Sequence, residues 1–227
     1  MTTVLFWDID GTLLNSNGAG LGALTKAASQ MMGKAVDLSA ISLAGMTDWA
    51  IATQVLEQHR WASGASEIKT LLRLYCEHLP ASLLRSQGFV LSGVKDILSS
   101  LHQRDDVFSL ILTGNIATGG WAKLSHYGLK HYFDIGAFCE QSPHRHDIAK
   151  QALALAEEVL GTVSLEKCFV IGDTPHDVRC GQAIGVKTVG IASGRYSVEE
   201  LAASGSPLVY EFFPQPQDFM REIGLIL

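Results

Sequence analysis

A short apolar run that stops at two acids and a glycine is the feature that most constrains the fold of this sequence. Residues 4–7 read Val-Leu-Phe-Trp, and residues 8–12 read Asp-Ile-Asp-Gly-Thr. Such a run is typical of a parallel strand that is buried on both faces. Its abrupt polar end predicts a loop at the carboxyl edge of the sheet, which is where binding sites form in α/β folds.

Similar apolar runs recur later in the chain, and helical patterns lie between them. The helical patterns fall at residues 94–104 and 146–160, where apolar residues return at a spacing close to that of a helix. The alternation of strands and helices predicts an α/β fold with a parallel sheet. The further strands are expected at residues 108–112, 168–171 and 186–191.

A stretch of about 70 residues, 17–86, lies between the first two predicted strands, and it is far longer than an ordinary crossover. Apolar residues there follow a helical spacing with many alanines, so an all-helical insertion is expected. Either Thr47 or Asp48 is a candidate N-cap of its middle helix. The three helices are expected at residues 20–32, 49–60 and 67–84.

Composition excludes several classes of function. The chain has 227 residues and a formal net charge of −6, and its seventeen Lys and Arg residues form no cluster, so nucleic acid is not an expected partner. No apolar run reaches the roughly 18 residues that span a bilayer, so no membrane is expected. The four cysteines show no CxxC pair and no secretory leader is recognised, which favours a cytoplasmic protein with free thiols.

Asp8 and Asp10 are separated by one residue, so both side chains leave an extended chain on the same face. Two carboxylates placed in this way repel each other unless they share a proton or a cation such as Mg²⁺, which prefers hard oxygen ligands. Gly11 lets the backbone turn tightly, and Gly11 and Thr12 are candidate phosphate-binding residues.

Two other predicted strands also end in polar residues. Asp173 and Asp177 follow the strand at 168–171 and are candidate metal ligands at the same sheet edge as Asp8. The strand at 108–112 is followed by Thr113, Gly114 and Asn115, whose hydroxyl, backbone and amide groups can hydrogen-bond a phosphate oxygen.

The order of these motifs resembles that of the haloacid dehalogenase superfamily, and the likeness spans nearly the whole chain. The resemblance implies a Rossmann-like parallel core with an inserted α-helical cap, as in phosphoglycolate-phosphatase-like members. The core is expected to comprise residues 1–16 and 87–227, and the cap residues 17–86.

The resemblance also implies a division of labour among the acids. Asp8 would attack phosphorus to form an aspartyl phosphate, and Asp10 would protonate the leaving oxygen and later activate water. Thr113 would bind the transferring phosphoryl group. Mg²⁺ would be held by Asp8, the carbonyl of Asp10 and Asp173, with Asp177 as a nearby acidic partner. Dehalogenases of the superfamily lack the second acid, so Asp10 favours a phosphatase.

Members of the family commonly carry a basic site residue in the form of a lysine followed by proline, and this chain departs from that form. This chain has Ser142-Pro143-His144-Arg145 instead. Arg145 is the preferred catalytic cation, because a guanidinium can bridge a phosphoryl oxygen and a carboxylate. Lys150 is the alternative, although it falls inside the predicted helix.

The expected function is a Mg²⁺-dependent phosphatase acting on a small phosphomonoester, with phosphoglycolate or a similar compound as substrate. Two alternatives remain at the level of sequence. One is a phosphosugar mutase of the same superfamily, and the other is a non-catalytic phosphate-binding protein on this fold.

Overall fold

A computed structural model describes residues 2–39, 41, 45–140 and 144–226. Its centre is a six-stranded sheet with the order β5-β4-β1-β6-β7-β8, in which every neighbouring pair is parallel. The predicted α/β fold with a parallel sheet is therefore confirmed. The strands are β1 (Thr3–Trp7), β4 (Val107–Leu112), β5 (Gly136–Ala137), β6 (Cys168–Gly172), β7 (Lys187–Ile191) and β8 (Leu208–Tyr210).

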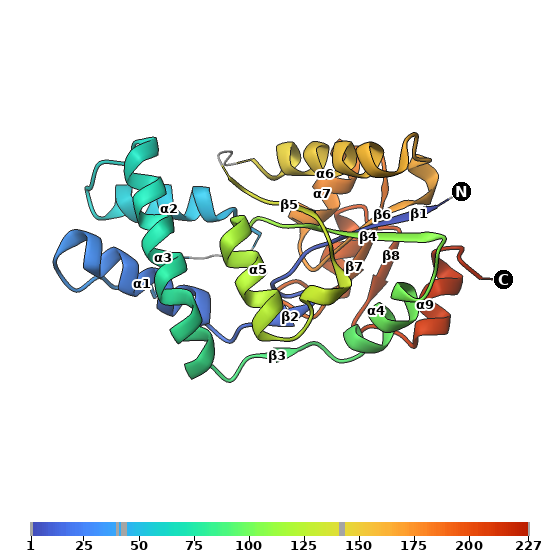
Figure 1. Cartoon of the computed structure of the whole chain (residues 1–227), viewed down its shortest axis with the longest axis horizontal. Coiled ribbons are helices and arrows are strands. Elements are labelled where there is room, and N and C mark those ends of the chain that lie inside the picture. The colour runs from blue at the N-terminus through green and yellow to red at the C-terminus, as the bar shows by residue number, and fades with distance from the viewer. Residues whose placement is uncertain (1, 40, 42–44, 141–143, 227) are drawn as a thin grey trace.

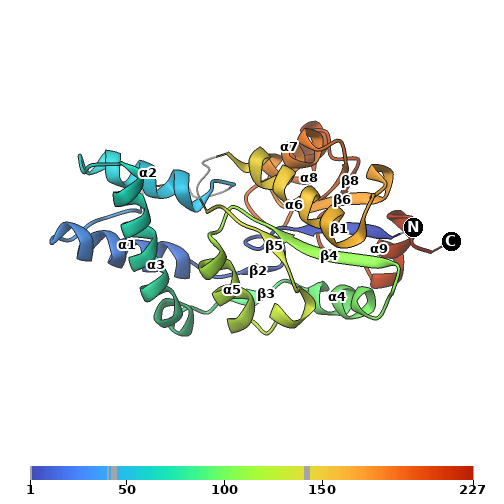
Figure 2. The same cartoon turned by 45° about the horizontal axis from the view of Figure 1, so that its top comes forward.

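Helices cover both faces of this sheet, as Figure 2 shows. Alternate residues of β1 point to opposite faces: Leu5 and Trp7 pack in one apolar cluster, and Val4 and Phe6 in another. The first cluster includes α4 (Val94–His102), α5 (Ala117–His126) and α9 (Pro216–Glu222). The second includes α6 (Arg145–Leu160) and α7 (Pro175–Ala183), while the short α8 (Val198–Ala203) contacts β7 and β8.

Three of the helices between β1 and β4 form a separate group beside the carboxyl edge of the sheet (Figure 1). We call them the helical insert: α1 (Ala19–Met32), α2 (Asp48–Gln58) and α3 (Ala65–Arg85). Their buried residues make their own apolar cluster, to which the core contributes Ile116. The N-cap of α2 is Thr47, whose Oγ1 accepts a hydrogen bond from the Ala50 N–H.

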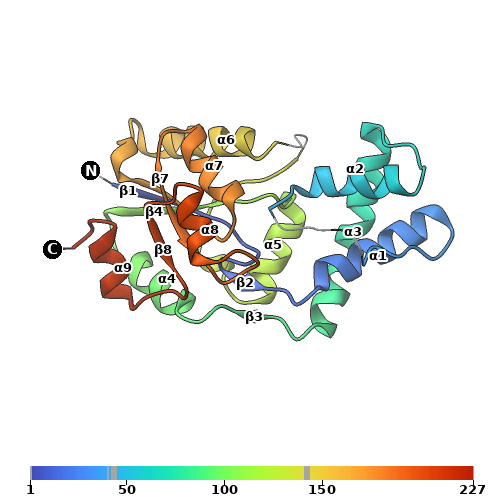
Figure 3. The ribbon, with the colours of Figure 1, turned by 180° about the vertical axis from the view of Figure 1, so that it is seen from behind.

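The two chain segments that join the insert to the core lie next to each other. They form the two-stranded antiparallel pair β2 (Leu14–Asn15) and β3 (Phe89–Val90). Gly88 precedes β3 where the chains crowd, since a Cβ there would lie 2.6 Å from the Asn15 carbonyl oxygen and closer still to the Tyr127 hydroxyl. The chain termini lie at the end of the molecule away from the insert (Figures 1 and 3).

The elements that the sequence did not reveal are short or poorly patterned: β2, β3, β5, β8 and the helices α5, α7, α8 and α9. Helix α6 begins at Arg145, one residue before the predicted start. All four cysteines are free thiols. Within the described ranges, no helix combines the length and the apolar character that crossing a membrane would require.

Candidate active site

Three neighbouring strands deliver polar residues to one edge of the sheet. β1 lies between β4 and β6, and the residues that follow these strands are Asp8, Thr113 and Asp173. All three are buried, with 1–5% of their surface exposed. Because parallel strands end at the same edge, the candidate residues that the sequence placed far apart meet in space.

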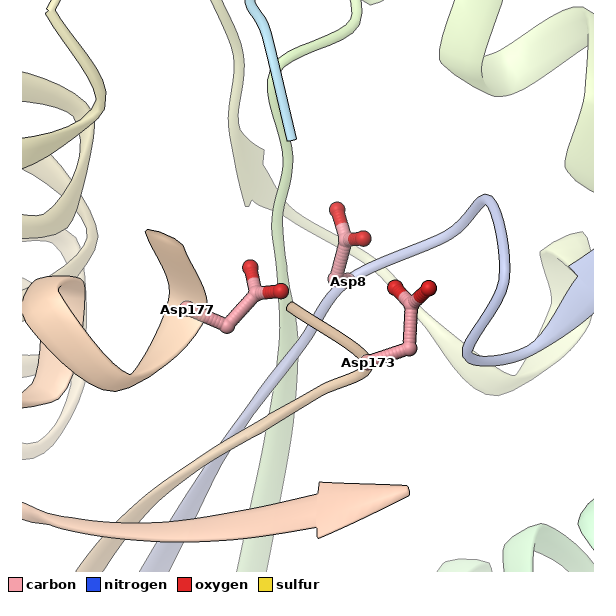
Figure 4. Close-up of side chains that lie close together, drawn as sticks. All are labelled: Asp8, Asp173 and Asp177. Atoms are coloured by element: carbon pink, nitrogen blue, oxygen red, sulfur yellow. The ribbon is translucent and has the colours of Figure 1, made fainter. Parts of the chain in front are cut away.

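The carboxylates of Asp8, Asp173 and Asp177 form a compact cluster. One oxygen from each lies within 4.8 Å of the others, and Figure 4 shows the side chains directed toward a common space. Hard oxygen donors of this kind are the ligands that Mg²⁺ prefers. The donor set therefore fits a divalent cation, in agreement with the sequence-based assignment of these acids. The Asp10 side chain is not part of this cluster, so Asp10 would contribute its backbone carbonyl, as the family resemblance implies.

The electrostatics of the cluster support this fit. The pKa of Asp8 is raised to about 7 on balance: burial raises it most, Arg145 and a hydrogen bond from Thr113 lower it, and the carboxylates of Asp177 and Asp10 raise it. Burial, followed by the Asp177 and Asp8 carboxylates, also raises the pKa of Asp173. The three carboxylates of the cluster outnumber the single guanidinium beside them, and a bound cation would favour their ionised forms.

Arg145 is the cation that the core places in this cluster. Its guanidinium donates to Asp8 Oδ1 at 3.3 Å and also forms an ion pair with Asp177. Burial lowers the pKa of Arg145, but the Asp177 and Asp8 carboxylates outweigh this effect and the net direction is upward. The alternative, Lys150, is exposed on α6. Ser142 and Pro143, which precede Arg145 in the departing motif, lie outside the described residues.

Asp177 supports the cluster from the first turn of α7. Its Oδ2 accepts hydrogen bonds from the backbone N–H and the hydroxyl of Thr174, which is the N-cap of this helix. Its Oδ1 accepts from Arg145. Both oxygens are thus engaged by protein donors, which suits the role of an acidic partner that orients Arg145.

Asp10 belongs to a second polar network, and this network contains a residue that the sequence analysis missed. Lys123 of α5 is buried, and its Nζ lies 2.5 Å from Asp10 Oδ2 and 2.7 Å from Asn115 Oδ1. The Asn115 amide donates to the same Asp10 oxygen at 2.8 Å and to Thr113 Oγ1 at 2.9 Å. Asp10 is thereby fixed through Oδ2, and its other oxygen remains the one that can exchange a proton with a substrate.

The other residues expected to bind phosphate have different surroundings. Gly11 has a φ of 84°, and a Cβ there would lie 2.3 Å from Asp173 Oδ2, so only glycine fits. The Thr12 hydroxyl is buried and donates to Asp173 Oδ1 at 3.4 Å. A Cβ on Gly114 would lie 2.7 Å from the Met46 carbonyl oxygen of the insert. In this structure Gly11 packs closely against Asp173, Thr12 forms a hydrogen bond with Asp173, and Gly114 packs closely against the insert.

A cavity of about 400 Å³ opens between the core and the insert. Asp8, Asp10, Thr113, Asn115, Lys123, Arg145 and Asp173 lie along its core side. On the insert side lies Asp48, a second residue whose contact with the site the sequence analysis did not foresee. The tryptophans Trp49, Trp61 and Trp121 are absent from the described lining of this cavity.

Comparison with known proteins identifies the family. Residues 4–191 match the family described as haloacid dehalogenase-like hydrolase. A fructose-1-phosphate phosphatase of Escherichia coli, YqaB, is 27% identical over 82% of this chain and 95% of its own length.

Solved structures show the same fold. A hydrolase from Pseudomonas syringae superposes with a TM-score of 0.71 at 21% identity, covering 100% of this chain and 99% of that one. CbbY from Rhodobacter sphaeroides in complex with phosphate superposes with a TM-score of 0.73 at 17% identity, covering 93% of this chain and 95% of that one. The expected superfamily and the expected class of enzyme, a phosphatase, are both confirmed. This chain belongs to the haloacid dehalogenase-like hydrolase family.

Proposed function

We propose that this protein is a Mg²⁺-dependent phosphatase that hydrolyses a small phosphorylated metabolite through an aspartyl phosphate on Asp8. The observation that carries the proposal is the convergence of a carboxylate cluster, the Arg145 guanidinium and Thr113 on one side of a cavity that Asp10 also lines. A nucleophile, phosphoryl contacts and a proton donor are thus within reach of one substrate.

Each side chain has a distinct role in this mechanism. An oxygen of Asp8 attacks phosphorus, and the bond from phosphorus to the ester oxygen breaks as Asp10 gives that oxygen a proton. Water then attacks the aspartyl phosphate while Asp10 takes up its proton, which releases phosphate and restores Asp8. Thr113 and Arg145 orient the phosphoryl group and stabilise its charge. Asp8, Asp173 and the Asp10 carbonyl would hold Mg²⁺, with Asp177 as a nearby acidic partner, and the cation would supply positive charge to the phosphoryl oxygens.

The helical insert is proposed to act as a cap comprising residues 17–86, joined to a core of residues 1–16 and 87–227. Three observations support this division: the insert has its own apolar cluster, its two connecting strands pair with each other, and its residues line the cavity. A cap of this kind contacts the leaving group and excludes water during the reaction.

The substrate is proposed to be a small phosphomonoester. The family resemblance pointed to phosphoglycolate or a similar compound, and the relative from Escherichia coli is named for fructose 1-phosphate. Both fit the proposed class. A phosphosugar mutase and a non-catalytic phosphate-binding protein remain the alternatives, and release of inorganic phosphate separates hydrolysis from both.

The direct test is phosphate release by the purified protein from p-nitrophenyl phosphate and a panel of small phosphomonoesters with MgCl₂. We expect turnover that EDTA abolishes and excess Mg²⁺ restores. Asp8→Asn should lose it while keeping the circular dichroism spectrum of the wild type. Comparable turnover by folded Asp8→Asn would overturn the assignment of the nucleophile.

A further inference from the structure

The two sides of the cavity differ in chemical character. The core side carries the reacting and phosphoryl-binding groups, whereas the insert side is mostly apolar. Among the described insert residues along the cavity, Asp48 is the one with a formal charge. The other large side chains that the insert contributes are Leu21, Leu24, Met46, Ile51, Leu72 and Tyr75.

Asp48 is hydrogen-bonded to the segment of the core that follows β4, residues 113–116. It is the first residue of α2, and its N–H donates to the Gly114 carbonyl at 2.8 Å. Its Oδ2 accepts from the Ile116 N–H at 2.9 Å. These bonds fix the carboxylate beside Thr113 and Asn115, which flank Gly114. The hydrogen bonds of the Asp48 side chain to described residues use Oδ2, so Oδ1 is the oxygen that can accept from a ligand.

The buried cations nearby are already engaged with other carboxylates. Lys123 contacts Asp10 and Asn115, and Arg145 contacts Asp8 and Asp177. Arg195 also contributes to the cavity, but it is exposed, so solvent and salt screen its charge. A leaving group that enters between Asp10 and the insert therefore meets the acid of Asp48 at close range.

The charge state of Asp48 makes it an acceptor at neutral pH. Its pKa is raised to about 6 on balance: burial raises it most, Lys123 and the Ile116 N–H lower it, and the Asp10 and Glu140 carboxylates raise it. A pKa near 6 still leaves the group mainly ionised at pH 7.5. An ionised carboxylate accepts hydrogen bonds and repels another anion.

We propose that Asp48 is a specificity-determining residue of the leaving-group subsite, where it accepts a hydrogen bond from a hydroxyl of a neutral, polyol-type or sugar-type alcohol and excludes leaving groups that carry a carboxylate. This inference rests on the proposed phosphatase function. Within the class of small phosphomonoesters, it selects phosphorylated polyols and sugars over phosphorylated hydroxy acids. The apolar residues of the insert contact the carbon atoms of such an alcohol.

A matched pair of substrates tests the proposal. Glycerol 3-phosphate and 3-phosphoglycerate share a carbon skeleton, and they differ in having a CH₂OH or a carboxylate at the end remote from the phosphate. The wild type is expected to favour glycerol 3-phosphate in kcat/KM by about tenfold or more. Asp48→Asn, which keeps an acceptor for the Ile116 N–H, should shift that ratio about tenfold toward 3-phosphoglycerate.

Glu140→Gln is the matched control. Glu140 accepts a hydrogen bond from the Ala117 N–H at the start of α5, is exposed and does not line the cavity, so its loss removes a similar charge outside the subsite. This variant should keep the ratio of the wild type. If Asp48→Asn fails to fold, Asp48→Ser offers a smaller neutral acceptor and the same shift is expected.

The outcomes separate this inference from the proposed function. A wild type that releases no phosphate from any ester contradicts the phosphatase function itself. A wild type that hydrolyses p-nitrophenyl phosphate but prefers 3-phosphoglycerate contradicts the role of Asp48. An unchanged ratio in a folded, active Asp48 variant contradicts it as well.

Discussion

Lys123 Nζ lies 2.5 Å from Asp10 Oδ2, so a buried lysine of α5 holds the acid to which proton transfer is attributed. Burial lowers the pKa of Lys123, but the Asp10, Tyr75 and Asp48 groups raise it more strongly, so the ammonium form is retained. Asn115 bonds to both partners and to Thr113, which connects the proposed proton donor with the hydroxyl proposed to bind the phosphoryl group. The groups proposed for proton transfer and for phosphoryl binding therefore share one hydrogen-bonded support.

Lys123→Met should lower kcat/KM for alkyl phosphates by about tenfold to a hundredfold, since kcat/KM reports the step in which the alcohol leaves and a misplaced general acid forfeits part of its roughly 10²–10⁴-fold contribution. The loss should be much smaller for p-nitrophenyl phosphate, whose leaving group needs no proton. Steady-state kinetics on both substrates measures the difference. Lys95→Met, which alters an exposed lysine of α4, serves as the control and should leave both rates unchanged. Equal losses in kcat/KM on the two substrates would contradict a role in positioning Asp10 as the general acid.

Arg145→Met should lower kcat by about a hundredfold or more, because it removes a charged donor to the reacting phosphoryl group. Lys150→Met should have little effect, since Lys150 is exposed on the same helix. Arg145→Lys retains the charge without the planar fork and should fall between the two. Loss of a buried ion-pair partner also destabilises a fold by about 3–5 kcal/mol, so thermal melts must accompany the kinetics. A large loss with Lys150→Met and none with folded Arg145→Met would reverse the choice between the two cations.

Mg²⁺ should stabilise the folded protein. A cation at 100 times its Kd contributes about 2.7 kcal/mol, which corresponds to roughly 5–10 °C in Tm for a chain of this size. Differential scanning fluorimetry with MgCl₂ and with EDTA measures the shift. Asp173→Asn should lose most of it, and Asp96→Asn, at an exposed position of α4, should keep it. The site would be misassigned if both variants respond to Mg²⁺ as the wild type does.

Asp48 should make stability depend on pH in a defined direction. Its pKa is raised from 3.8 to about 6 in the folded protein, mainly by burial, so ionisation is easier in the unfolded chain. The wild type therefore loses stability from this group as the pH rises from about 4 to 6, by at most about 3 kcal/mol. The Asp48→Asn variant lacks this ionisable group and does not lose this stability. The difference between its free energy of unfolding and that of the wild type should therefore rise from about pH 4 to 6 and stay constant above pH 6. Urea denaturation between pH 4 and 8 checks the curve, and a flat difference would contradict the burial of this charge.

The central fold could be predicted because its strands are apolar runs that need no tertiary context to be recognised. Residues 4–7 and 168–171 lie in strands β1 and β6 for this reason. Helix α5 was not predicted because Gly119 and Gly120 weaken the helical spacing of its apolar residues. Packing explains at least one of these glycines, since a Cβ on Gly120 would lie 2.8 Å from the Phe138 ring.

The candidate site likewise contains residues that could be predicted from the sequence and residues that could not. Asp8, Asp173 and Thr113 could be found because each follows an apolar strand, and parallel strands end together. Lys123 could not be found, because it lies 113 residues from Asp10 in the sequence and on a helix that was not predicted. Asp48 was considered only as a possible helix cap, since periodicity within the insert does not reveal how the insert docks on the core.

The pairing of β2 with β3 has a consequence beyond the site. The chain leaves the core and returns to it through adjacent, hydrogen-bonded segments at Leu14–Asn15 and Phe89–Val90. Because the first and last residues of the insertion lie next to each other, the insertion does not affect the order of the strands in the sheet. Another segment of different length could be accommodated between the same two points without disturbing β1 or β4. Evolution can therefore exchange the segment proposed to recognise the alcohol while the core proposed to break the ester bond is inherited intact.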